Sequence, residues 1–149
     1  MRLLFRVKIS KPADGIWKFL VTAEYFQQWN DKIESIDCRG EFRSGESFAT
    51  RYQWRGKITQ CMTTVTALVP LRLLELHHSD FVGLDVKNDM DVVERISLSG
   101  RAGWTMVTRQ LRIKNHGVPI ILIPVLWFVS RFGRPTEPDP LKVMCERGS

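Results

Sequence analysis

Two charged residues stand on strand faces that are otherwise apolar. In one strand-like segment every second residue is apolar except Arg109, and in the segment before it every second residue is apolar except Glu94. Side chains alternate between the two faces of a strand, so each inward face would carry a single charge. The same counting places Gln60 and His78 inward. These four residues are predicted to form a small polar set inside an apolar hollow.

Glu94 and Arg109 admit two interpretations. An arginine in an apolar cavity is a natural anchor for a ligand carboxylate or phosphate, while the surrounding apolar side chains hold the body of the ligand. Alternatively, the two residues lie on neighbouring strands and pair with each other, because buried charges are normally paired. The second interpretation gives the pair a structural role and is the more common situation in proteins.

His78 is the candidate for acid or base chemistry, together with Glu94. An inward histidine could serve as a general acid or base toward a bound ligand, because an ordinary histidine pKa lies near neutrality. More often a single histidine on a strand is a hydrogen-bonded wall residue. His77 points to the opposite face, so the adjacent pair cannot chelate one metal ion. No second ligand pair and no nucleotide, zinc or hydrolase motif occurs, so we expect neither metal nor cofactor.

Composition is typical of one globular domain spanning residues 1–149. Hydrophobic residues make up 44% of the chain and charged residues 26%, which suffices for a core without disulfides. Cys38, Cys61 and Cys145 have no paired spacing and are predicted to be reduced thiols. The chain opens on a strand pattern and not on an export signal, so we expect a cytoplasmic location.

The net charge of +6 comes from Lys and Arg scattered along the chain without a basic run. Such a distribution is typical of a solvated surface, so we expect no nucleic-acid binding. A transient contact with an anionic membrane surface stays open. Both a monomer and a homodimer are compatible with the composition.

Periodicity predicts an α+β order of elements. A strand at Leu4–Ile9 is followed by two short helices, with Ser10 and Thr22 as their N-caps. Short connections between the strands that come next make the sheet antiparallel. The predicted strands are 32–38, 47–54, 57–68, 71–78, 91–98 and 104–113.

The most apolar run, residues 118–129, predicts a long C-terminal helix that covers the sheet. Pro124 provides a bending point, so we expect this helix and the acidic segment 79–90 to move apart to admit ligand. The alternative is a rigid helix whose extra apolar face is covered by the N-terminal helices or by a second copy of the chain. A last helical turn or two is expected after Pro140.

This order of elements resembles the START-like superfamily. The most specific part of the resemblance is the spacing of Pro12, Trp17, Leu20 and Trp29. Further matching features, in chain order, are Gly40, Gly45, Val69-Pro70, Leu141, Lys142 and Glu146. The superfamily includes polyketide cyclase/dehydrase, lipid-transport and Bet v 1-like proteins. The resemblance implies the helix-grip fold, in which a seven-stranded antiparallel sheet wraps around the last helix and an apolar cavity.

The resemblance also implies binding or transport of a hydrophobic small molecule, such as a lipid or a polyketide-like compound. A cyclase/dehydrase-type enzyme that uses the same cavity is the alternative, with His78 and Glu94 as candidate catalytic residues. A partner-binding module is a third reading. The predicted ligand-binding residues are Arg109, Glu94, His78, Gln60, Trp17, Trp29, Met62, Val107, Leu122 and Leu126.

Overall fold

The computed structural model describes residues 2–30, 32–54, 57–82, 90–115 and 139–147. Within these ranges the chain forms three helices and one seven-stranded sheet. The helices are α1 (Ala13–Val21), α2 (Ala23–Trp29) and α4 (Pro140–Arg147). The strands are β1 (Arg2–Ile9), β2 (Ile33–Ile36), β3 (Ser47–Trp54), β4 (Lys57–Val69), β5 (Leu73–Val82), β6 (Met90–Arg101) and β7 (Trp104–Asn115).

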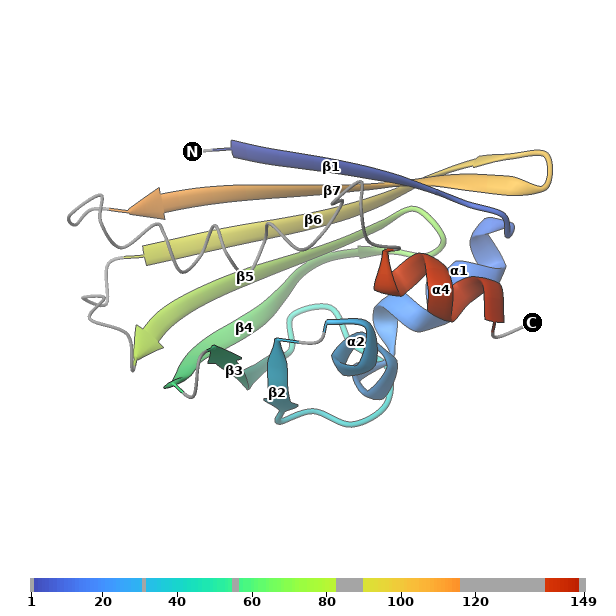
Figure 1. Ribbon diagram of the computed structural model, residues 1–149. Helices are drawn as coiled ribbons and strands as arrows, with labels where there is room; N and C mark the ends of the chain where they lie inside the picture. The colour runs from blue at the N-terminus through green and yellow to red at the C-terminus, as the bar shows by residue number, and fades with distance from the viewer. Residues whose placement is uncertain (1, 31, 55–56, 83–89, 116–138, 148–149) are drawn as a thin grey trace.

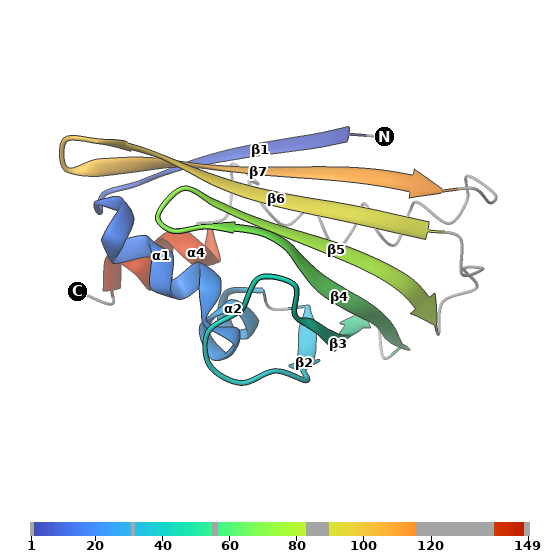
Figure 2. The same cartoon turned by 180° about the vertical axis from the view of Figure 1, so that it is seen from behind.

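The sheet is antiparallel throughout, in the order β1-β7-β6-β5-β4-β3-β2. Strands β2 to β7 follow one another as a meander, and β1 adds to the far edge beside β7. The sheet curls so that β2 and β3 turn under β4 (Figure 1). All three helices gather on one side of the sheet, toward the end that holds the β4–β5 and β6–β7 turns (Figure 2). The predicted α+β class and antiparallel sheet are confirmed.

Helices α1 and α2 meet at Thr22, which ends the first and precedes the second. Its extended backbone breaks the helical run, as predicted, although its side chain makes no capping hydrogen bond. The predicted N-cap at Ser10 is wrong, because α1 begins after Pro12, whose backbone is extended. The backbone N–H of Ser10 instead donates to Glu146 in α4, at 3.0 Å, which ties the start of the chain to its last helix.

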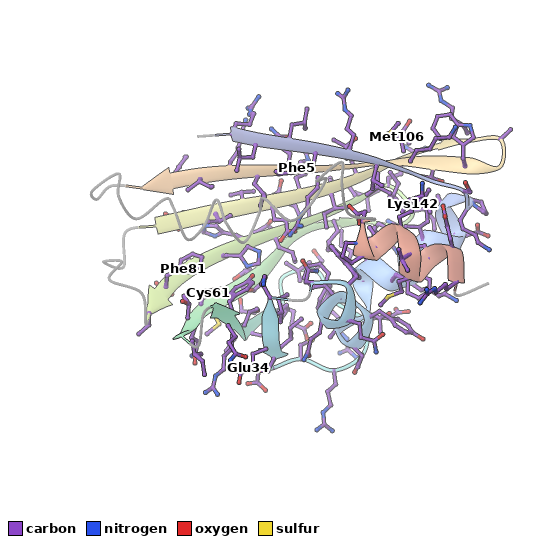
Figure 3. The ribbon with its side chains drawn as sticks, viewed as in Figure 1. Phe5, Glu34, Cys61, Phe81, Met106 and Lys142 are labelled. Atoms are coloured by element: carbon purple, nitrogen blue, oxygen red, sulfur yellow. The ribbon has the colours of Figure 1, made fainter. Side chains whose placement is uncertain are left out.

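Apolar side chains on the helix-facing side of the sheet form two clusters. The first packs the helices against the sheet and contains, among others, Ile9, Ile16, Leu20, Val65, Leu74, Leu76, Ile96, Val107 and Leu141. The second lies farther along the strands and contains Cys61, Phe81, Val92, Leu111 and Ile113. Cys61 and Phe81 lie near the end of the sheet that is away from the helices (Figure 3).

The short helix α4 follows Asp139, whose Oδ1 accepts a hydrogen bond from the backbone N–H of Leu141 at 2.9 Å. An aspartate N-cap followed by proline in the first turn is a favourable helix start, and this helix fits the turn expected there. The long helix predicted over 118–129, with its bend at Pro124, lies outside the described residues. No helix in the described ranges is long and apolar enough to cross a membrane.

Candidate functional site

His78, Glu94 and Arg109 come together on the concave, helix-facing side of the sheet. Glu94 lies opposite Leu76 of β5 and Leu111 of β7, so His78 and Arg109 are its diagonal neighbours on the two flanking strands. His78 Nε2 is 3.0 Å from Glu94 Oε1. Both Nε and Nη2 of Arg109 contact Glu94 Oε2 at 2.5 Å. The predicted pairing of Glu94 with Arg109 is therefore confirmed.

Two threonines extend this arrangement toward the other edge of the sheet. Thr63 Oγ1 is 2.9 Å from His78 Nδ1, and Thr50 Oγ1 is 2.8 Å from Thr63 Oγ1. We call Thr50, Thr63, His78, Glu94 and Arg109 the polar chain. Each of its members comes from a different strand, so it crosses β3, β4, β5, β6 and β7 in order.

At the other end, Arg109 reaches the helical layer. Its Nη2 donates to Asn30 Oδ1 at 3.4 Å, and Asn30 is the C-cap of α2. The guanidinium carbon lies 5.6 Å from the centre of the Trp29 ring, a cation–π distance. Trp29 is held in place by its indole N–H, which donates to the backbone oxygen of Phe19 at 2.8 Å.

The polar chain runs between the two apolar clusters. In β6, Glu94 separates Val92 of the second cluster from Ile96 of the first. In β7, Arg109 separates Leu111 from Val107 in the same way. The concave side therefore has a polar belt across it, bordered by apolar surface on both sides. Exposures of 4% for His78, 3% for Glu94 and 9% for Arg109 show that the charged part of the belt is buried.

The neighbours of Glu94 decide its protonation state. Burial raises the pKa of Glu94, but the charge of Arg109 and the hydrogen bond from His78 lower it further, to about 2. Burial lowers the pKa of His78, but the hydrogen bonds to its ring and the negative charge of Glu94 outweigh burial and raise that pKa to about 9. At neutral pH the Glu94 carboxylate thus lies between an imidazolium and a guanidinium, and these three side chains together carry one positive charge in excess.

Protonation of His78 fixes the direction of the hydrogen bonds. Both ring nitrogens of an imidazolium donate, so Nε2 donates to Glu94 and Nδ1 donates to Thr63. Thr63 Oγ1 is also hydrogen-bonded to Thr50 Oγ1, and either hydroxyl can be the donor of that bond. Because both ring nitrogens are engaged, the geometry matches the wall-residue interpretation of His78 better than the acid–base interpretation.

Gln60 and Met62 do not lie where the alternation argument placed them. Gln60 is exposed and its Oε1 accepts from Arg51 Nε at 3.2 Å, while Met62 is 41% exposed. The inward residues of β4 are the intervening ones, including Thr63. Both faces of this strand mix threonine with apolar residues, so hydrophobicity alone selected the wrong face. The inward orientation predicted for Gln60 and Met62 is wrong.

The other predicted ligand contacts fall into three groups. Trp29 and Val107 are both buried in the first cluster, and the Trp29 ring also lies beside Arg109. Trp17 is partly buried and packs on the same cluster from α1. Leu122 and Leu126 lie outside the described residues. Ligand contact by any of them stays a prediction.

Asp139 is a buried polar residue that the sequence arguments treated only as a helix start. Burial raises its pKa, against the opposing effects of two backbone hydrogen bonds and of the Arg109 charge. Its Oδ1 caps α4, whereas its Oδ2 is buried and has no hydrogen-bond partner among the described residues. Because the Arg109 charge influences this buried carboxyl, Asp139 is a further polar feature among the described residues.

Other reactive side chains are few within the described ranges. No three His, Cys, Asp or Glu side chains gather there as a metal site. His77 lies 3.0 Å from Asp91 and does not approach the polar chain, in accord with the alternation. All three cysteines are free. Burial raises the pKa of the Cys145 thiol to about 12, and burial with a hydrogen bond to Glu46 raises that of Cys38 to about 11. Neither thiol is activated as a nucleophile.

No family model matches the sequence, and no curated protein matches it. Solved structures do match the fold. Protein MLL2253 from Mesorhizobium loti aligns over 100% of this chain and 99% of its own, with 17% identity and a TM-score of 0.74. Ara h 8.0201 aligns over 99% of this chain and 96% of its own, with 14% identity and a TM-score of 0.71.

DynU16, a protein from the dynemicin biosynthetic locus, aligns over 99% of this chain and 48% of its own, with 18% identity and a TM-score of 0.64. At these identities the matches establish the fold and leave the activity open. The chain shares the fold of these proteins, a curled seven-stranded antiparallel sheet with its helices on one side, which agrees with the fold that the sequence resemblance implied.

Proposed function

We propose that this domain binds a hydrophobic small molecule with an acidic head group against the concave side of its sheet. The observation that carries the proposal is the buried polar belt between two apolar clusters. A molecule with an apolar body and a charged end would match that surface, with the head at the polar chain and the body along the second cluster, which includes Leu111 and Ile113.

Charge supports an acidic head group. Arg109 and the protonated His78 supply two positive charges, and Glu94 supplies one negative charge. Burying ions costs several kcal/mol each, and apolar side chains would fill the same space at a lower cost. A ligand carboxylate near the belt would offset the excess charge. This is a stronger reason for acidic ligands than an isolated arginine would give.

Geometry favours binding over a cyclase/dehydrase reaction. A general base must accept a proton from the substrate, yet both ring nitrogens of His78 are hydrogen-bonded to Thr63 and Glu94. Its raised pKa also keeps it protonated at neutral pH. Fold neighbours carry no activity over to this chain at their low identity, and among the described residues neither His78 nor Glu94 is placed as a free acid or base.

The proposal is tested by ligand titration. We expect a long-chain fatty acid to bind, observed by native mass spectrometry and by tryptophan fluorescence, and its methyl ester to bind at least tenfold more weakly, because a charge-assisted hydrogen bond contributes about 1.5–3 kcal/mol. Equal affinities for the fatty acid and its methyl ester would contradict the acidic head group, while leaving the binding of a hydrophobic molecule in place. Absence of binding to fatty acids and to aromatic polyketones would contradict the proposal as a whole.

A pair of equal truncations locates the ligand. Leu111→Ala, in the second cluster, is expected to weaken fatty-acid binding, since it removes apolar contact surface. Leu74→Ala is the control, because Leu74 is 0% exposed in the first cluster, beneath the helices. Both variants remove the same side-chain atoms and are expected to lower the free energy of unfolding by similar amounts. Equal affinities in the two variants would place the ligand elsewhere.

A further inference from the structure

The outward face of β1, β7 and β6 is strongly basic. Alternation along these strands turns seven cations away from the core, and all are exposed. They are Arg2, Arg6 and Lys8 of β1, Arg112 and Lys114 of β7, and Arg95 and Arg101 of β6. We call these residues the basic face. Nitrogen-tipped side chains project from β1 and β7 on the side away from the helices (Figure 3).

Cations crowd together on this face with few acids to balance them. Arg2 lies directly opposite Arg112 in the β1–β7 register, and like charges in that position repel. The acids on the described part of the face are Glu75, 3.9 Å from Arg95, and Asp91, which contacts His77. Arg2, Arg6 and Arg112 make no ion pair with any described residue. The face keeps a positive potential that its own side chains do not neutralise.

A shallow depression lies within the basic face. It is lined by two arginines, one glutamate and two uncharged residues: Arg95, Arg112, Glu75, Val93 and Gln110. Two guanidinium groups and one carboxylate line this hollow and leave one positive charge in excess, which suits a phosphate oxygen, because guanidinium binds phosphate with paired hydrogen bonds. The depression adds a local recognition element to the general charge.

We propose that the basic face docks the protein on an anionic membrane surface. The cations are spread over three strands as a two-dimensional array, which matches a layer of lipid head groups. Leu4, between Arg2 and Arg6 on the same face, is 52% exposed and can enter the interfacial region. This face lies opposite the concave side, so docking leaves the polar belt facing away from the bilayer. The inference is independent of the proposed ligand.

Nucleic acid fits this face less well. Binding of single strands relies on aromatic platforms for base stacking. Among the described residues of the face Trp104 is the only aromatic one, and Lys8 covers its ring at 4.6 Å from the centre. A broad sheet without a groove or an inserted helix also offers little to the backbone of a duplex.

The expected affinity loss follows from charge. Each Lys or Arg held near an anionic bilayer contributes about 1 kcal/mol, equivalent to about a fivefold change in partitioning. The triple variant Arg6→Gln, Lys8→Gln, Arg112→Gln is therefore expected to bind about a hundredfold more weakly. These side chains are exposed, so the fold should tolerate the changes.

The experiment is co-sedimentation with vesicles of phosphatidylcholine alone or with 30% phosphatidylserine. Wild-type protein is expected to bind the anionic vesicles only, with binding weakened by added salt. The control triple variant is Arg39→Gln, Arg43→Gln, Arg72→Gln, which makes the same charge change at exposed residues outside the basic face. It should keep most of the binding.

Three results would overturn the proposal. One is the absence of wild-type binding to anionic vesicles. Another is an equal loss of binding in the two triple variants, which would show a general charge effect without a defined face. The third is tight binding to a DNA duplex, measured by fluorescence anisotropy, that depends on the basic face while vesicle binding does not.

Discussion

Replacing Arg109 by methionine should destabilise the protein by about 3 kcal/mol. The change removes both nitrogens that lie 2.5 Å from Glu94 Oε2 and leaves a buried carboxylate short of a cation. Breaking a buried ion pair costs about 3–5 kcal/mol. We expect the lower end of that range, because His78 stays 3.0 Å from the other carboxylate oxygen.

The double variant separates pairing from packing. Glu94→Gln alone leaves Arg109 and His78 as neighbouring buried cations and is also expected to cost about 3 kcal/mol. Arg109→Met with Glu94→Gln removes both charges at once. It should therefore lose about 2 kcal/mol less than the sum of the single changes, which is the coupling energy of the pair.

Urea unfolding followed by circular dichroism at pH 6 measures this cycle. The control is the cycle Arg95→Met and Glu75→Gln, whose groups are 3.9 Å apart and whose arginine side chain is 53% exposed. An exposed pair should show a coupling energy below about 1 kcal/mol. A coupling energy for the buried pair no larger than that of the control would refute the argument that Arg109 and Glu94 stabilise each other.

Three further changes probe the same region. Stability should be greatest between pH 4.5 and 6.5. The lowered pKa of Glu94 contributes folding stability that is lost as pH falls toward about 2, and the raised pKa of His78 contributes stability that is lost as pH rises through about 9. Urea denaturation at a series of pH values measures both contributions. A stability profile that His78→Gln leaves unchanged would contradict this assignment. Thr63→Val should lower the free energy of unfolding by about 1–3 kcal/mol, because it leaves a buried imidazole N–H without an acceptor. Gln60→Ala, on the opposite face of β4, should change it by less than about 0.5 kcal/mol. Equal effects of the two variants in urea unfolding would be inconsistent with the orientation of this strand. Asp139→Asn should keep the helix cap and be at least as stable as wild type at pH 7, whereas Asp139→Ala should lower the free energy of unfolding by about 1 kcal/mol. Thermal unfolding measures the order of the two variants. A higher melting temperature for the alanine variant would argue against the cap.

Much of the fold follows from the sequence because its signals are local. Strands β3 and β7 begin where predicted, at Ser47 and Trp104, since period-two alternation starts there after a turn. Glu94 and Arg109 were identified because a charge within an apolar row is conspicuous. Their partner His78 followed from the same count on the preceding strand.

The remaining members of the site carry no such signal. Thr50 and Thr63 are residues that suit either face of a sheet, so nothing in the sequence shows that they face inward. Asn30 and Asp139 reach the site only through the packing of α2 and α4, which depends on contacts distant in sequence. The error at Gln60 has the same origin, because both faces of β4 are of similar polarity.

The polar chain also bears on how the sheet selects its pairing during folding. Its five members come one from each of five successive strands, and each hydrogen bond requires a particular diagonal or direct pairing. A slip of one residue in any of these strands would turn its member to the opposite face. A slip of β6 would withdraw Glu94 and leave Arg109 and His78 buried without an anion. Strand registers that would bury a similar amount of apolar surface are therefore unfavourable when they misalign the belt. The belt thus helps to specify the native register, which an all-apolar interior would not do.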